Sequence, residues 1–587
     1  MNLSEFKARL AEADSMPAVA LDEGDISTPP ANRSTSLPLF SVVDQRSRCS
    51  GEGTRVRVAS TRDRLDGIRA NSKKKDFLKA REVSEVITAE FTRRGALYDD
   101  GSRTYVFLKD SRVLLPIGPD EDALCMALFD YGLFPQDRLT TDVIDALRYA
   151  AKRTGQRTEV HALSFYDRHS CTAYIYDFAG GVFVVAPSGV RHCDNGIDGH
   201  LFIQNPKWEP INIIGTVQNP IDWQKWLLNG IQFATGDLDA NDSGFLLRVW
   251  VLSLYFPQLF PTRPILALTG EKGCGKSSLL RRLGQMLFGP RFNITAMTAK
   301  PDDFDALVTT DPLVIADNAD KAPSWLEDRL AVIATGGTIQ RRSYYTTNKL
   351  VDFPIRATVG ITSRTPEFRR EDVAERLVPL KLERITTFGA ENELLADVQR
   401  LRQSLLTAII GDVYRAVCQL EKQKSHQHVS ATRLADFASF ATKVGPVLGM
   451  EQPDVDRLFN RLSGQQVAFV TQDDPLFELV RSWLAKQGNV NREVSSTELM
   501  SELESLAPGG DVPWAAGNPR SFAAYTRDRA GTLRSMFSLR QRTGHAGASF
   551  LTLGGRLEPS GAAGDSGDES PLFVEQVVKS VVGNGGL

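Results

Sequence analysis

The sequence has few cysteines, and none of them forms a pair of the kind that holds a metal or a disulfide framework. The 587 residues include six cysteines, and no two stand in a C-x-x-C arrangement. Zinc modules need closely spaced ligand pairs, and small secreted domains need many paired cysteines. His192 and Cys193, with His200 nearby, lack a second ligand pair at the usual spacing. We therefore expect reduced, mostly buried thiols and no metal site at these residues.

Long apolar runs and a secretory leader are also missing. The apolar stretches fall short of the ~20 residues that cross a bilayer. The chain begins with MNLSEFKARLAEAD, which is amphipathic and charged and has no apolar core followed by a cleavage site. A hydrophobic content of 42% and a charged content of 24% are ordinary for globular proteins. We expect a cytoplasmic protein with no membrane partner.

The chain has almost no net charge, since its formal charge is only -3. Whole-protein electrostatics therefore does not indicate a nucleic-acid partner, and any such surface has to be local. One candidate is the stretch from Arg55 to Arg81, which carries ten Lys or Arg against three Asp. Such a segment can contact phosphates. The alternative is a solvated, partly helical linker, because charge runs are common on flexible segments.

A glycine-rich loop at residues 270–277 carries the clearest chemical signal. The apolar run PILALT at 264–269 is followed by the loop and then by SLLRRLGQMLF, which is strand, loop and helix in the order that G-x-x-x-x-G-K-[ST] requires. Glycines let successive N–H groups face phosphates, and the helix N-terminus adds positive charge. We expect Lys276 to bind the β- and γ-phosphates of ATP and Ser277 to ligate Mg²⁺. The residues predicted to line the ATP site are Gly270, Glu271, Lys272, Gly273, Cys274, Gly275, Lys276, Ser277 and Ser278.

A second acidic element follows about forty residues later. Asp317 ends the apolar run PLVIADN at 312–318 and is predicted to be the outer carboxylate for magnesium. Asn318 stands where many such ATPases carry a glutamate that polarises the attacking water. An amide cannot accept a proton, so Asn318 can only orient water, and hydrolysis is either slow or recruits Asp320 or a neighbouring group. The alternative is a buried strand that simply ends in Asp at a turn.

A third strand and an arginine complete the predicted catalytic site. The run ATVGITS at 357–363 places Thr362 or Ser363 where a polar residue contacts the γ-phosphate, although Arg364 stands where an asparagine is often found. In ring ATPases an arginine placed like Arg376 reaches the γ-phosphate of the neighbouring subunit. Arg369 and Arg370 are the second choices. The alternative for Arg376 is a surface salt bridge to Glu371 or Glu375.

Between Asp317 and the third strand, two alternating runs predict a hairpin. The runs TIQRRSYYT and LVDFPIRAT flank Thr347-Asn348-Lys349. With GEKGCGKSS, VIADNAD and EDVAERLVPL in the same order, residues 230–385 resemble the superfamily-three helicases and primase-associated P-loop ATPases of phages and plasmids, which are AAA+-like. The resemblance implies a hexamer whose hairpin enters the pore and grips DNA, with Lys349 at its tip. It also implies that Arg341 and Arg342 brace the hairpin or line the subunit interface, and that a primase is a partner.

The C-terminal part carries a second local basic surface. Three helical patterns between residues 474 and 537, followed by SLRQRT and SFLTL, predict a winged helix. Residues 518–553 hold six arginines against one acid. This charge suits duplex contacts from a recognition helix and a wing, whereas a protein-docking or structural role is the alternative. The predicted DNA contacts are Arg520, Arg527, Arg534, Arg540 and Arg542.

The length predicts several domains in a multidomain α/β chain. The helices and alternating strands of 82–215 contain no cluster of acids, nucleophile and base, so no chemistry is assigned to them. We expect an ATP-dependent DNA helicase or translocase in the replication of a mobile element. The alternatives are a DNA-binding ATP switch and, with less support, a small-molecule kinase. The predicted divisions are a flexible basic segment (1–81), an α+β accessory domain (82–215), a P-loop AAA+-like core (216–389), a helical lid (390–472), a winged helix (473–553) and a disordered tail (554–587).

Overall fold

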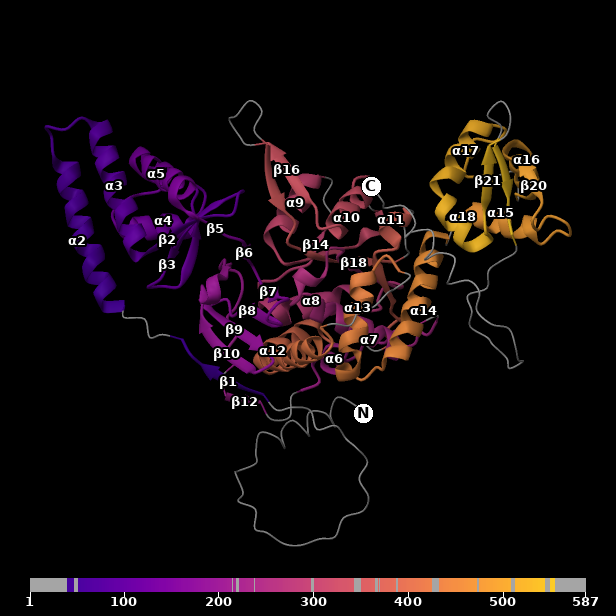
Figure 1. The fold of residues 1–587 in the computed structure, drawn as a ribbon, viewed down its shortest axis with the longest axis horizontal. Helices are drawn as coiled ribbons and strands as arrows, with labels where there is room; N and C mark the ends of the chain where they lie inside the picture. The colour runs from indigo at the N-terminus through magenta and orange to yellow at the C-terminus, as the bar shows by residue number, and fades with distance from the viewer. Residues whose placement is uncertain are drawn as a thin grey trace, which may run out of the picture. The chain divides into compact units, whose positions relative to one another are not determined.

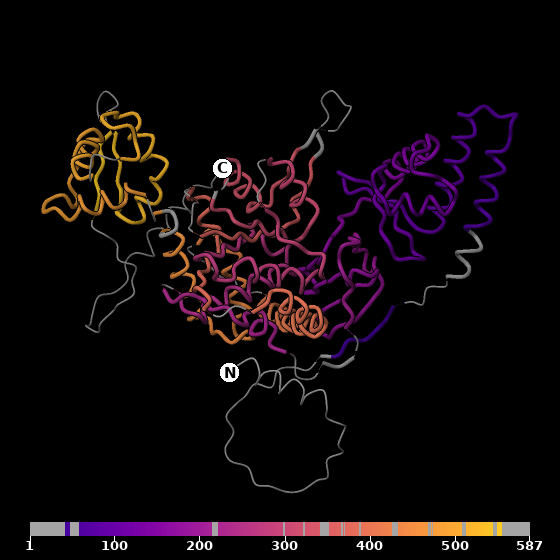
Figure 2. The backbone as a smooth tube through the Cα atoms, turned by 180° about the vertical axis from the view of Figure 1, so that it is seen from behind, coloured from indigo at the N-terminus to yellow at the C-terminus, as the bar shows by residue number. Residues whose placement is uncertain are grey.

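The computed structural model shows a mixed α/β protein with several sheets, as the sequence predicts (Figures 1 and 2). The predicted tail from 555 onward and the first 39 residues lie outside the part of the chain that the structure describes. The structure describes residues 40–46, 51–213, 215–217, 221–236, 238–296, 300–321, 323–342, 350–364, 368, 370–386, 389–424, 432–471, 474–507, 512–543 and 549–554.

Residues 51–157 form a small unit in which helices cover a four-stranded sheet of order β4-β3-β2-β5. Strand β3 alternates: Val106 and Leu108 belong to the hydrophobic cluster under the helices, and Tyr105 and Phe107 belong to a second cluster. This alternation follows from the two-residue period of a strand. The elements are α2 (Gly51–Ala70), α3 (Asp76–Arg94), β2 (Gly95–Asp99), β3 (Thr104–Leu108), β4 (Val113–Pro116), α4 (Asp122–Phe129), α5 (Arg138–Thr154) and β5 (Gln156–Arg157).

The basic stretch at 55–81 is helical and packed, so its prediction as a flexible segment is wrong. It forms most of α2 and the start of α3, and the two helices contact each other. Leu65 and Ile68 of α2, three residues apart on one helix face, are buried in the cluster shared with α3 and α5. The unit therefore begins near residue 51 instead of 82. Lys73, Lys74 and Lys75 lie in the turn between the two helices.

Most strands of residues 160–217 belong to a different, six-stranded sheet, and a strand from the predicted linker joins them. The sheet has the order β12-β1-β10-β9-β8-β7, with β1 (Phe40–Asp44) parallel to β10 and antiparallel to β12. Its side chains share one hydrophobic cluster with helices of the central part. The predicted accessory domain is thus divided between two hydrophobic cores. The other strands of this sheet are β7 (Ser164–Asp167), β8 (Thr172–Tyr176), β9 (Gly181–Ala186), β10 (Gly189–Asp194) and β12 (Gly215–Val217). Strands β6 (Val160–His161) and β11 (Leu201–Phe202) pair with each other in a separate two-stranded sheet.

A five-stranded parallel sheet lies at the centre, with the order β14-β15-β18-β13-β19. Strand β13 is buried along its whole length, which explains its uninterrupted apolar sequence. Because all five strands run the same way, the residues that follow them gather at one edge, where α/β proteins bind ligands. The strands are β13 (Ile265–Thr269), β14 (Thr295–Ala296), β15 (Leu313–Asp317), β18 (Thr358–Ser363) and β19 (Leu377–Lys381).

The helices predicted as a lid pack into the central hydrophobic cluster. On α12, buried Arg402 donates to the carbonyl oxygens of Met286 at 3.1 Å and Leu287 at 3.1 Å, near the C-terminal end of α8, where a cation is favoured. A lid movement of this segment stays a prediction. The helices of the predicted lid are α12 (Glu391–Lys422), α13 (Ala435–Leu448) and α14 (Gln452–Thr471). The helices that precede them in the central part are α6 (Trp223–Leu227), α7 (Ala240–Ser253), α8 (Lys276–Phe288), α9 (Pro301–Thr310), α10 (Leu326–Ala334) and α11 (Glu371–Ala374).

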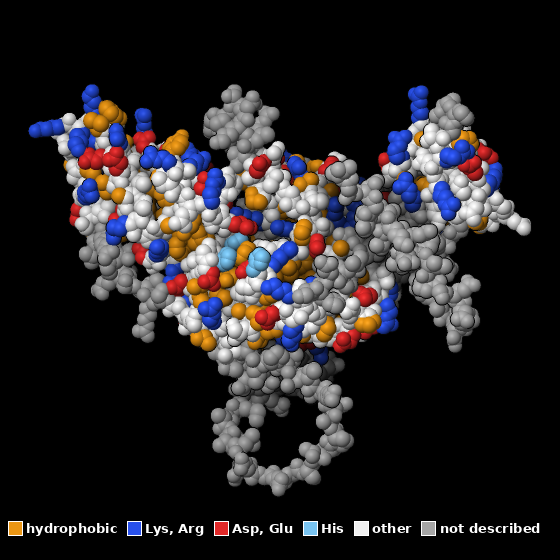
Figure 3. Space-filling view, viewed as in Figure 1, with side chains coloured by type: hydrophobic (Ala, Val, Ile, Leu, Met, Phe, Trp, Pro, Cys, Tyr) orange, Lys and Arg blue, Asp and Glu red, His pale blue; other side chains and the backbone are white. Residues whose placement is uncertain are grey.

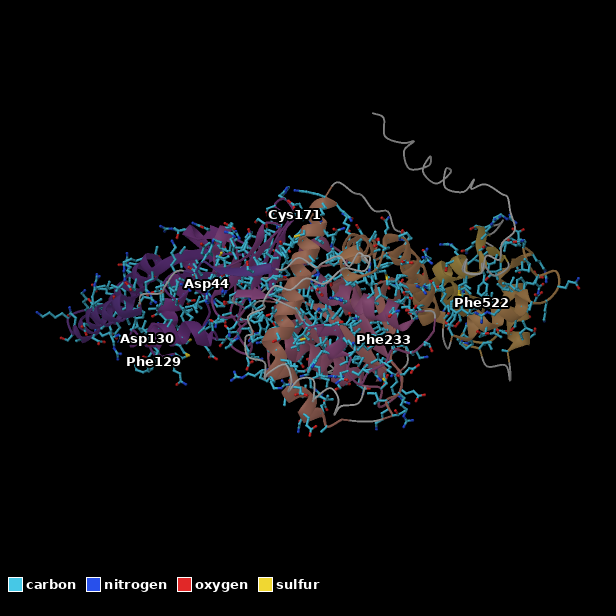
Figure 4. All side chains as sticks on the ribbon, turned by 90° about the horizontal axis from the view of Figure 1, so that it is seen from below. Asp44, Phe129, Asp130, Cys171, Phe233 and Phe522 are labelled. Atoms are coloured by element: carbon cyan, nitrogen blue, oxygen red, sulfur yellow. The ribbon has the colours of Figure 1, made fainter. Side chains whose placement is uncertain are left out.

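Residues 474–554 form a unit with its own hydrophobic cluster, and Phe522, labelled in Figure 4, is buried in it. The structure adds strand β20 to the predicted hairpin, giving a sheet of order β20-β22-β21. It also divides the third predicted helix at Arg529. The elements are α15 (Pro475–Leu484), β20 (Glu493–Ser495), α16 (Ser496–Leu506), α17 (Pro519–Asp528), α18 (Ala530–Phe537), β21 (Arg540–Thr543) and β22 (Ser549–Thr552).

Among the described residues, no helix combines the length and the apolar character needed to cross a membrane.

His161 on β6 gives the fold an acid sensitivity. Burial, with the nearby positive charges of His200 and Arg356, lowers the pKa of His161 to about 3. The unfolded chain therefore takes up a proton near pH 6.5 that the folded chain takes up only near pH 3. Stability that is complete above pH 6.5 then falls on acidification, by at most about 1.4 kcal/mol per pH unit from this residue.

We expect His161→Phe to lose this part of the pH dependence between pH 6.5 and 4. The measurement is the free energy of unfolding as a function of pH. The control is Phe165→Leu, which removes a ring whose centroid lies 4.6 Å from that of His161 without removing a titratable group. It should lower stability equally at each pH. An unchanged pH slope in His161→Phe would contradict the assignment.

Candidate functional site

The glycine-rich loop lies at the carboxyl edge of the central sheet. Strand β13 ends at Thr269, the loop follows, and α8 begins at Lys276. Gly270 has a φ of 142° and Gly275 a φ of 87°, which are values that side chains disfavour. A Cβ atom at Gly270 would lie 2.6 Å from the carbonyl oxygen of Leu382. Both the backbone conformation and this close approach therefore require glycine.

The side chains of the loop divide into buried and open ones. Lys276 Nζ donates to the carbonyl oxygens of Gly270 at 2.7 Å and Glu271 at 3.1 Å, so its ammonium group lies over the loop. Glu271 and Lys272 are exposed, whereas Cys274 is buried. Carbonyl oxygens are weaker partners for an ammonium than a phosphate is. The loop, with a helix N-terminus behind it, fits a phosphate group.

Three polar side chains from different elements meet beside the loop. The Asp317 carboxylate, at the end of β15, accepts from Ser277 Oγ at 2.7 Å and from Thr362 Oγ1 at 2.5 Å. Strand β18 lies between β13 and β15, which is why Thr362 reaches Asp317. A hydroxyl and a carboxylate at this spacing fit magnesium, which uses few protein ligands and completes its shell with phosphate oxygens and water. In the described part of the chain, no cluster of three or more His, Cys, Asp or Glu could hold a metal.

The structure separates the two predicted sensor residues. Thr362 Oγ1 bonds Asp317 and also accepts from the backbone N–H of Asn318 at 2.8 Å. Ser363 Oγ instead donates to Asp320 at 2.9 Å, and the Arg364 N–H donates to the same carboxylate. Thr362 is therefore the residue beside the predicted magnesium ligands, and Ser363 fixes Asp320.

Asn318 adopts a left-handed backbone conformation with a φ of 59°. Asparagine is among the few non-glycine residues that tolerate it. The bend leads from β15 into the short 3-10 turn Ala319–Lys321, which carries Asp320. The Asn318 side chain is exposed at the sheet edge. The asparagine that stands here in place of the usual glutamate thus occupies a position with a left-handed backbone conformation.

Arg376 lies at the opposite, amino edge of the sheet. Its carbonyl oxygen accepts from the N–H of Ile265, and Leu377 pairs with Ile265 at the start of β13. The loop follows the other end of β13, about 13 Å further along at 3.3 Å per residue. The Arg376 side chain is half-exposed and has no ion-pair partner among the described residues. Arg376 therefore lies away from the loop of its own subunit.

Of the two second choices to Arg376, Arg370 is held in ion pairs and Arg369 is not among the described residues. Arg370 forms ion pairs with Asp328 and, at 2.8 Å, with Asp372, and this arginine lowers the pKa of Asp372. Glu375, proposed as a partner of Arg376, instead pairs with Arg433 at 2.7 Å. Burial nevertheless raises the pKa of Glu375. Arg369 lies outside the described residues.

Buried Gln466 on α14 holds the backbone on both sides of Arg376. Its Nε2 donates to the carbonyl oxygens of Glu375 at 3.2 Å and Leu377 at 2.7 Å. Together with the Ile265 N–H, it fixes the three consecutive carbonyl groups of residues 375–377. The sequence analysis missed Gln466, because a glutamine in a helical pattern carries no signal of a partner 89 or 91 residues away.

The predicted hairpin exists, but its tip lies outside the described residues. Strands β16 (Thr338–Arg342) and β17 (Leu350–Pro354) pair antiparallel, with Arg341 opposite Val351. Arg341 and Arg342 are thus strand residues at the far end of β16. Lys349 comes between the two strands in the sequence, outside the described residues, and its contact with DNA stays a prediction.

The predicted basic residues of the C-terminal unit differ in their surroundings. Arg542 forms an ion pair with Glu493 at 2.9 Å and lies over the Phe550 ring, so its charge is largely compensated. The other four are exposed and have no ion-pair partner in the described part of the chain. Figure 3 shows Lys and Arg side chains over this unit. The four exposed arginines are Arg520, Arg527, Arg534 and Arg540.

Known proteins resemble the chain in part. Residues 227–458 match the model of a family described as an actinomycete integrative conjugative element replication protein. This segment runs from the end of α6 into α14 and includes the loop, Asp317, Thr362 and Arg376. No curated protein matches the chain.

Solved structures share the fold only loosely. An apo structure of the NrS-1 C terminal region is 14% identical with a TM-score of 0.37, over 80% of this chain and 98% of that one. A structure titled "SCCmec type IV Cch - active helicase" is 10% identical with a TM-score of 0.38, over 78% and 92%. At these values the likeness supplies no residue-by-residue correspondence.

Proposed function

We propose that the chain is an ATP-dependent DNA helicase or translocase that acts in the replication of a mobile element. The observation that carries the proposal is the meeting of the glycine loop, Ser277, Asp317 and Thr362 at the carboxyl edge of a parallel sheet. The likeness of residues 227–458 to a mobile-element replication protein supports the biological setting.

In this proposal the site binds MgATP and positions the phosphates. Loop N–H groups and Lys276 bind the phosphate oxygens, and Ser277 and Asp317 hold the magnesium ion, which neutralises charge on the phosphates. Thr362 keeps the Asp317 carboxylate turned toward Ser277. Burial of Cys274 beneath the loop fixes the loop against the core. The chemistry then needs little beyond positioning and charge.

The attacking water has two candidate partners in the proposed site. Asn318 is exposed at the sheet edge and can orient water through its amide. Asp320 can accept a proton, but its carboxylate already accepts from Ser363 and from the Arg364 N–H. These two bonds already occupy the Asp320 carboxylate. Hydrolysis by this chain is accordingly expected to be slow without DNA.

The DNA contacts are proposed for two separate parts. Lys349 in the hairpin tip, braced by Arg341 and Arg342, would contact single-stranded or forked DNA in the pore of a ring, and the family resemblance implies that this ring is a hexamer. The exposed arginines of the C-terminal unit, proposed as a winged helix, would contact duplex phosphates. A primase is proposed as a partner on the family resemblance alone.

ATP hydrolysis tests the proposal directly. We expect purified protein to hydrolyse ATP slowly alone and several-fold faster with single-stranded or forked DNA. Lys276→Ala should fall to background in both conditions because the phosphates lose their ammonium partner. Lys349→Ala should keep the DNA-free rate and lose the stimulation. DNA binding without any stimulation would refute the motor.

The C-terminal arginines should contribute to DNA binding through charge. We expect Arg520→Ala, Arg527→Ala and Arg534→Ala together to weaken duplex binding, and the slope of log Kd against log salt to fall by about one per lost contact. Binding titrations at several salt concentrations measure this. Arg542→Ala is the matched control, since Glu493 already compensates its charge. An unchanged slope in the triple variant would place the duplex contact elsewhere.

A DNA-binding ATP switch is the second candidate. It is favoured by one observation, the exposed Asn318 in place of a glutamate. A switch binds ATP and DNA together but turns over at a rate that DNA leaves unchanged. The hydrolysis experiment therefore separates the two candidates.

A further inference from the structure

Strand β18 ends in the middle of the candidate site. It lies between β13, which leads into the glycine loop, and β15, which ends at Asp317. In the register of the sheet, Thr269 of β13 is opposite Ser363 of β18. The next residue along the chain is Gly270 after β13 and Arg364 after β18. Because neighbouring strands lie about 4.8 Å apart, Arg364 leaves the sheet close to the first residue of the loop.

Hydrogen bonds hold the backbone of Arg364 at this place. Its N–H donates to the Asp320 carboxylate, and Ser363 Oγ donates to the same carboxylate at 2.9 Å. Thr362 Oγ1, one residue earlier, accepts from the N–H of Asn318 at 2.8 Å. The end of β18 is therefore tied to the segment that follows β15, and this fixes the point from which the Arg364 side chain starts.

Arg364 differs from the two residues before it in having donors to spare. A hydroxyl group has one proton to donate. Thr362 Oγ1 gives its proton to Asp317 at 2.5 Å, and Ser363 Oγ gives its proton to Asp320. The Arg364 side chain is exposed, and its guanidinium has no ion-pair partner among the described residues. Of residues 362–364, Arg364 is thus the one that can donate to a ligand.

The position of Arg364 suits the last phosphate of ATP. In the proposed function this phosphate lies between the glycine loop and the magnesium ion at Asp317, and β18 ends between these two elements. Arg376 lies at the opposite edge of the sheet. Arg384 is exposed at the same edge as Arg364 but follows β19, on the far side of β13 from β18. A guanidinium presents a fork of donors that matches phosphate oxygens and keeps its charge.

We propose that Arg364 contacts the γ-phosphate of the ATP bound to its own subunit and is a catalytic residue for its hydrolysis. The proposal rests on the proposed ATPase function. Water attacks the γ-phosphorus, the bond to the oxygen between the β- and γ-phosphates breaks, and the electron pair of that bond stays on ADP. Arg364 forms no covalent bond and stays protonated. Its charge stabilises the phosphate oxygens most strongly in the transition state.

Turnover and nucleotide binding by the full-length chain test this role. We expect Arg364→Ala to lower kcat about 10²-fold with little change in KM. Arg364→Lys keeps the charge without the fork and should fall between this variant and the parent. The affinity for ADP with aluminium fluoride, which imitates the transferred phosphate, should drop by a similar factor in Arg364→Ala. The affinity for ADP alone should stay unchanged, since ADP has no γ-phosphate. Arg384→Ala is the matched control and should behave like the parent.

Mixed assemblies show in which subunit Arg364 acts. Arg364→Ala subunits mixed with Lys276→Ala subunits should recover no activity, because each change damages the site of the subunit that carries it. Arg364→Ala subunits mixed with Arg376→Ala subunits should recover activity at about a quarter of the interfaces, where an intact site faces an intact Arg376. An arginine that acted on the neighbour's nucleotide would give the reverse pattern.

Several results would overturn the role of Arg364 while leaving the proposed function standing. They are a parent that hydrolyses ATP with an unchanged kcat in Arg364→Ala, an equal loss of affinity for ADP with and without aluminium fluoride, and recovery on mixing with Lys276→Ala. The second result would mean that Arg364 only supports the structure of the loop. A parent that binds no ADP would instead refute the proposed function and the role of Arg364 together.

Discussion

Replacing Arg376 with alanine is expected to lower the ATP turnover rate by about 10³-fold or more, the range for an arginine that reaches the transferred phosphate from a neighbouring subunit. The expectation rests on where Arg376 lies. Its backbone is bonded at the amino edge of the central sheet, and its side chain has no ion-pair partner among the described residues. The steady-state rate at saturating ATP and DNA measures the loss.

Subunit mixing shows whether Arg376 acts between subunits. Arg376→Ala subunits keep a complete loop, and Lys276→Ala subunits keep a complete arginine. Random mixing at equal amounts should bring a complete loop and a complete arginine together at about a quarter of the interfaces. Activity should recover in proportion to these intact interfaces. Arg370→Ala is the matched control and should change turnover little, since Arg370 is held by Asp328 and Asp372. No recovery at any ratio would contradict shared sites.

Replacing Asp412 with alanine is expected to cost about 3–5 kcal/mol of stability, the range for breaking a buried ion pair from one side. The carboxylate on α12 is buried and accepts from Trp223 Nε1 at 2.9 Å and from Arg248 Nη2 at 2.7 Å. Arg415 is its third partner. Without Asp412, the two guanidinium groups stay largely buried with no counter-charge. Calorimetric unfolding of the full-length chain measures the loss.

Two further variants serve as comparisons for Asp412→Ala. Asp412→Asn keeps the size of the side chain and an acceptor for Trp223, so it should lose less stability than the alanine variant. Asp454→Ala removes an exposed pair with Arg457 and should cost under about 1 kcal/mol. An alanine variant at 412 as stable as the parent would mean that the buried network contributes no net stability.

The elements of the candidate site were predictable because their signals are local. The glycine loop lies between a strand and a helix in the sequence, and Asp317 and Thr362 each end an apolar run of strand length. The sequence analysis left open whether Thr362 or Ser363 faces the site. Neighbouring strand residues point to opposite faces, and the order of the strands decides which face matters.

Features that depend on distant partners escaped the sequence analysis. Helix α2 has few apolar residues and many charges, so its burial depends on α3 and α5, which the pattern of α2 alone does not report. Strand β1 is short and lies in a Ser-, Thr- and Pro-rich context, and it is a strand because β10 and β12 flank it. Gln466 and Asp412 act through residues far away in the chain.

The two ends of β13 lie beside different candidate site residues. At one end Ile265 is bonded to Arg376, and at the other Thr269 leads into the glycine loop. In a ring, one fully buried five-residue strand would then connect a subunit's own nucleotide with the nucleotide of its neighbour. A buried strand transmits a shift with little loss, since close-packed interiors have low compressibility. A ring built in this way would therefore couple each subunit's own nucleotide to the arginine that it offers to its neighbour.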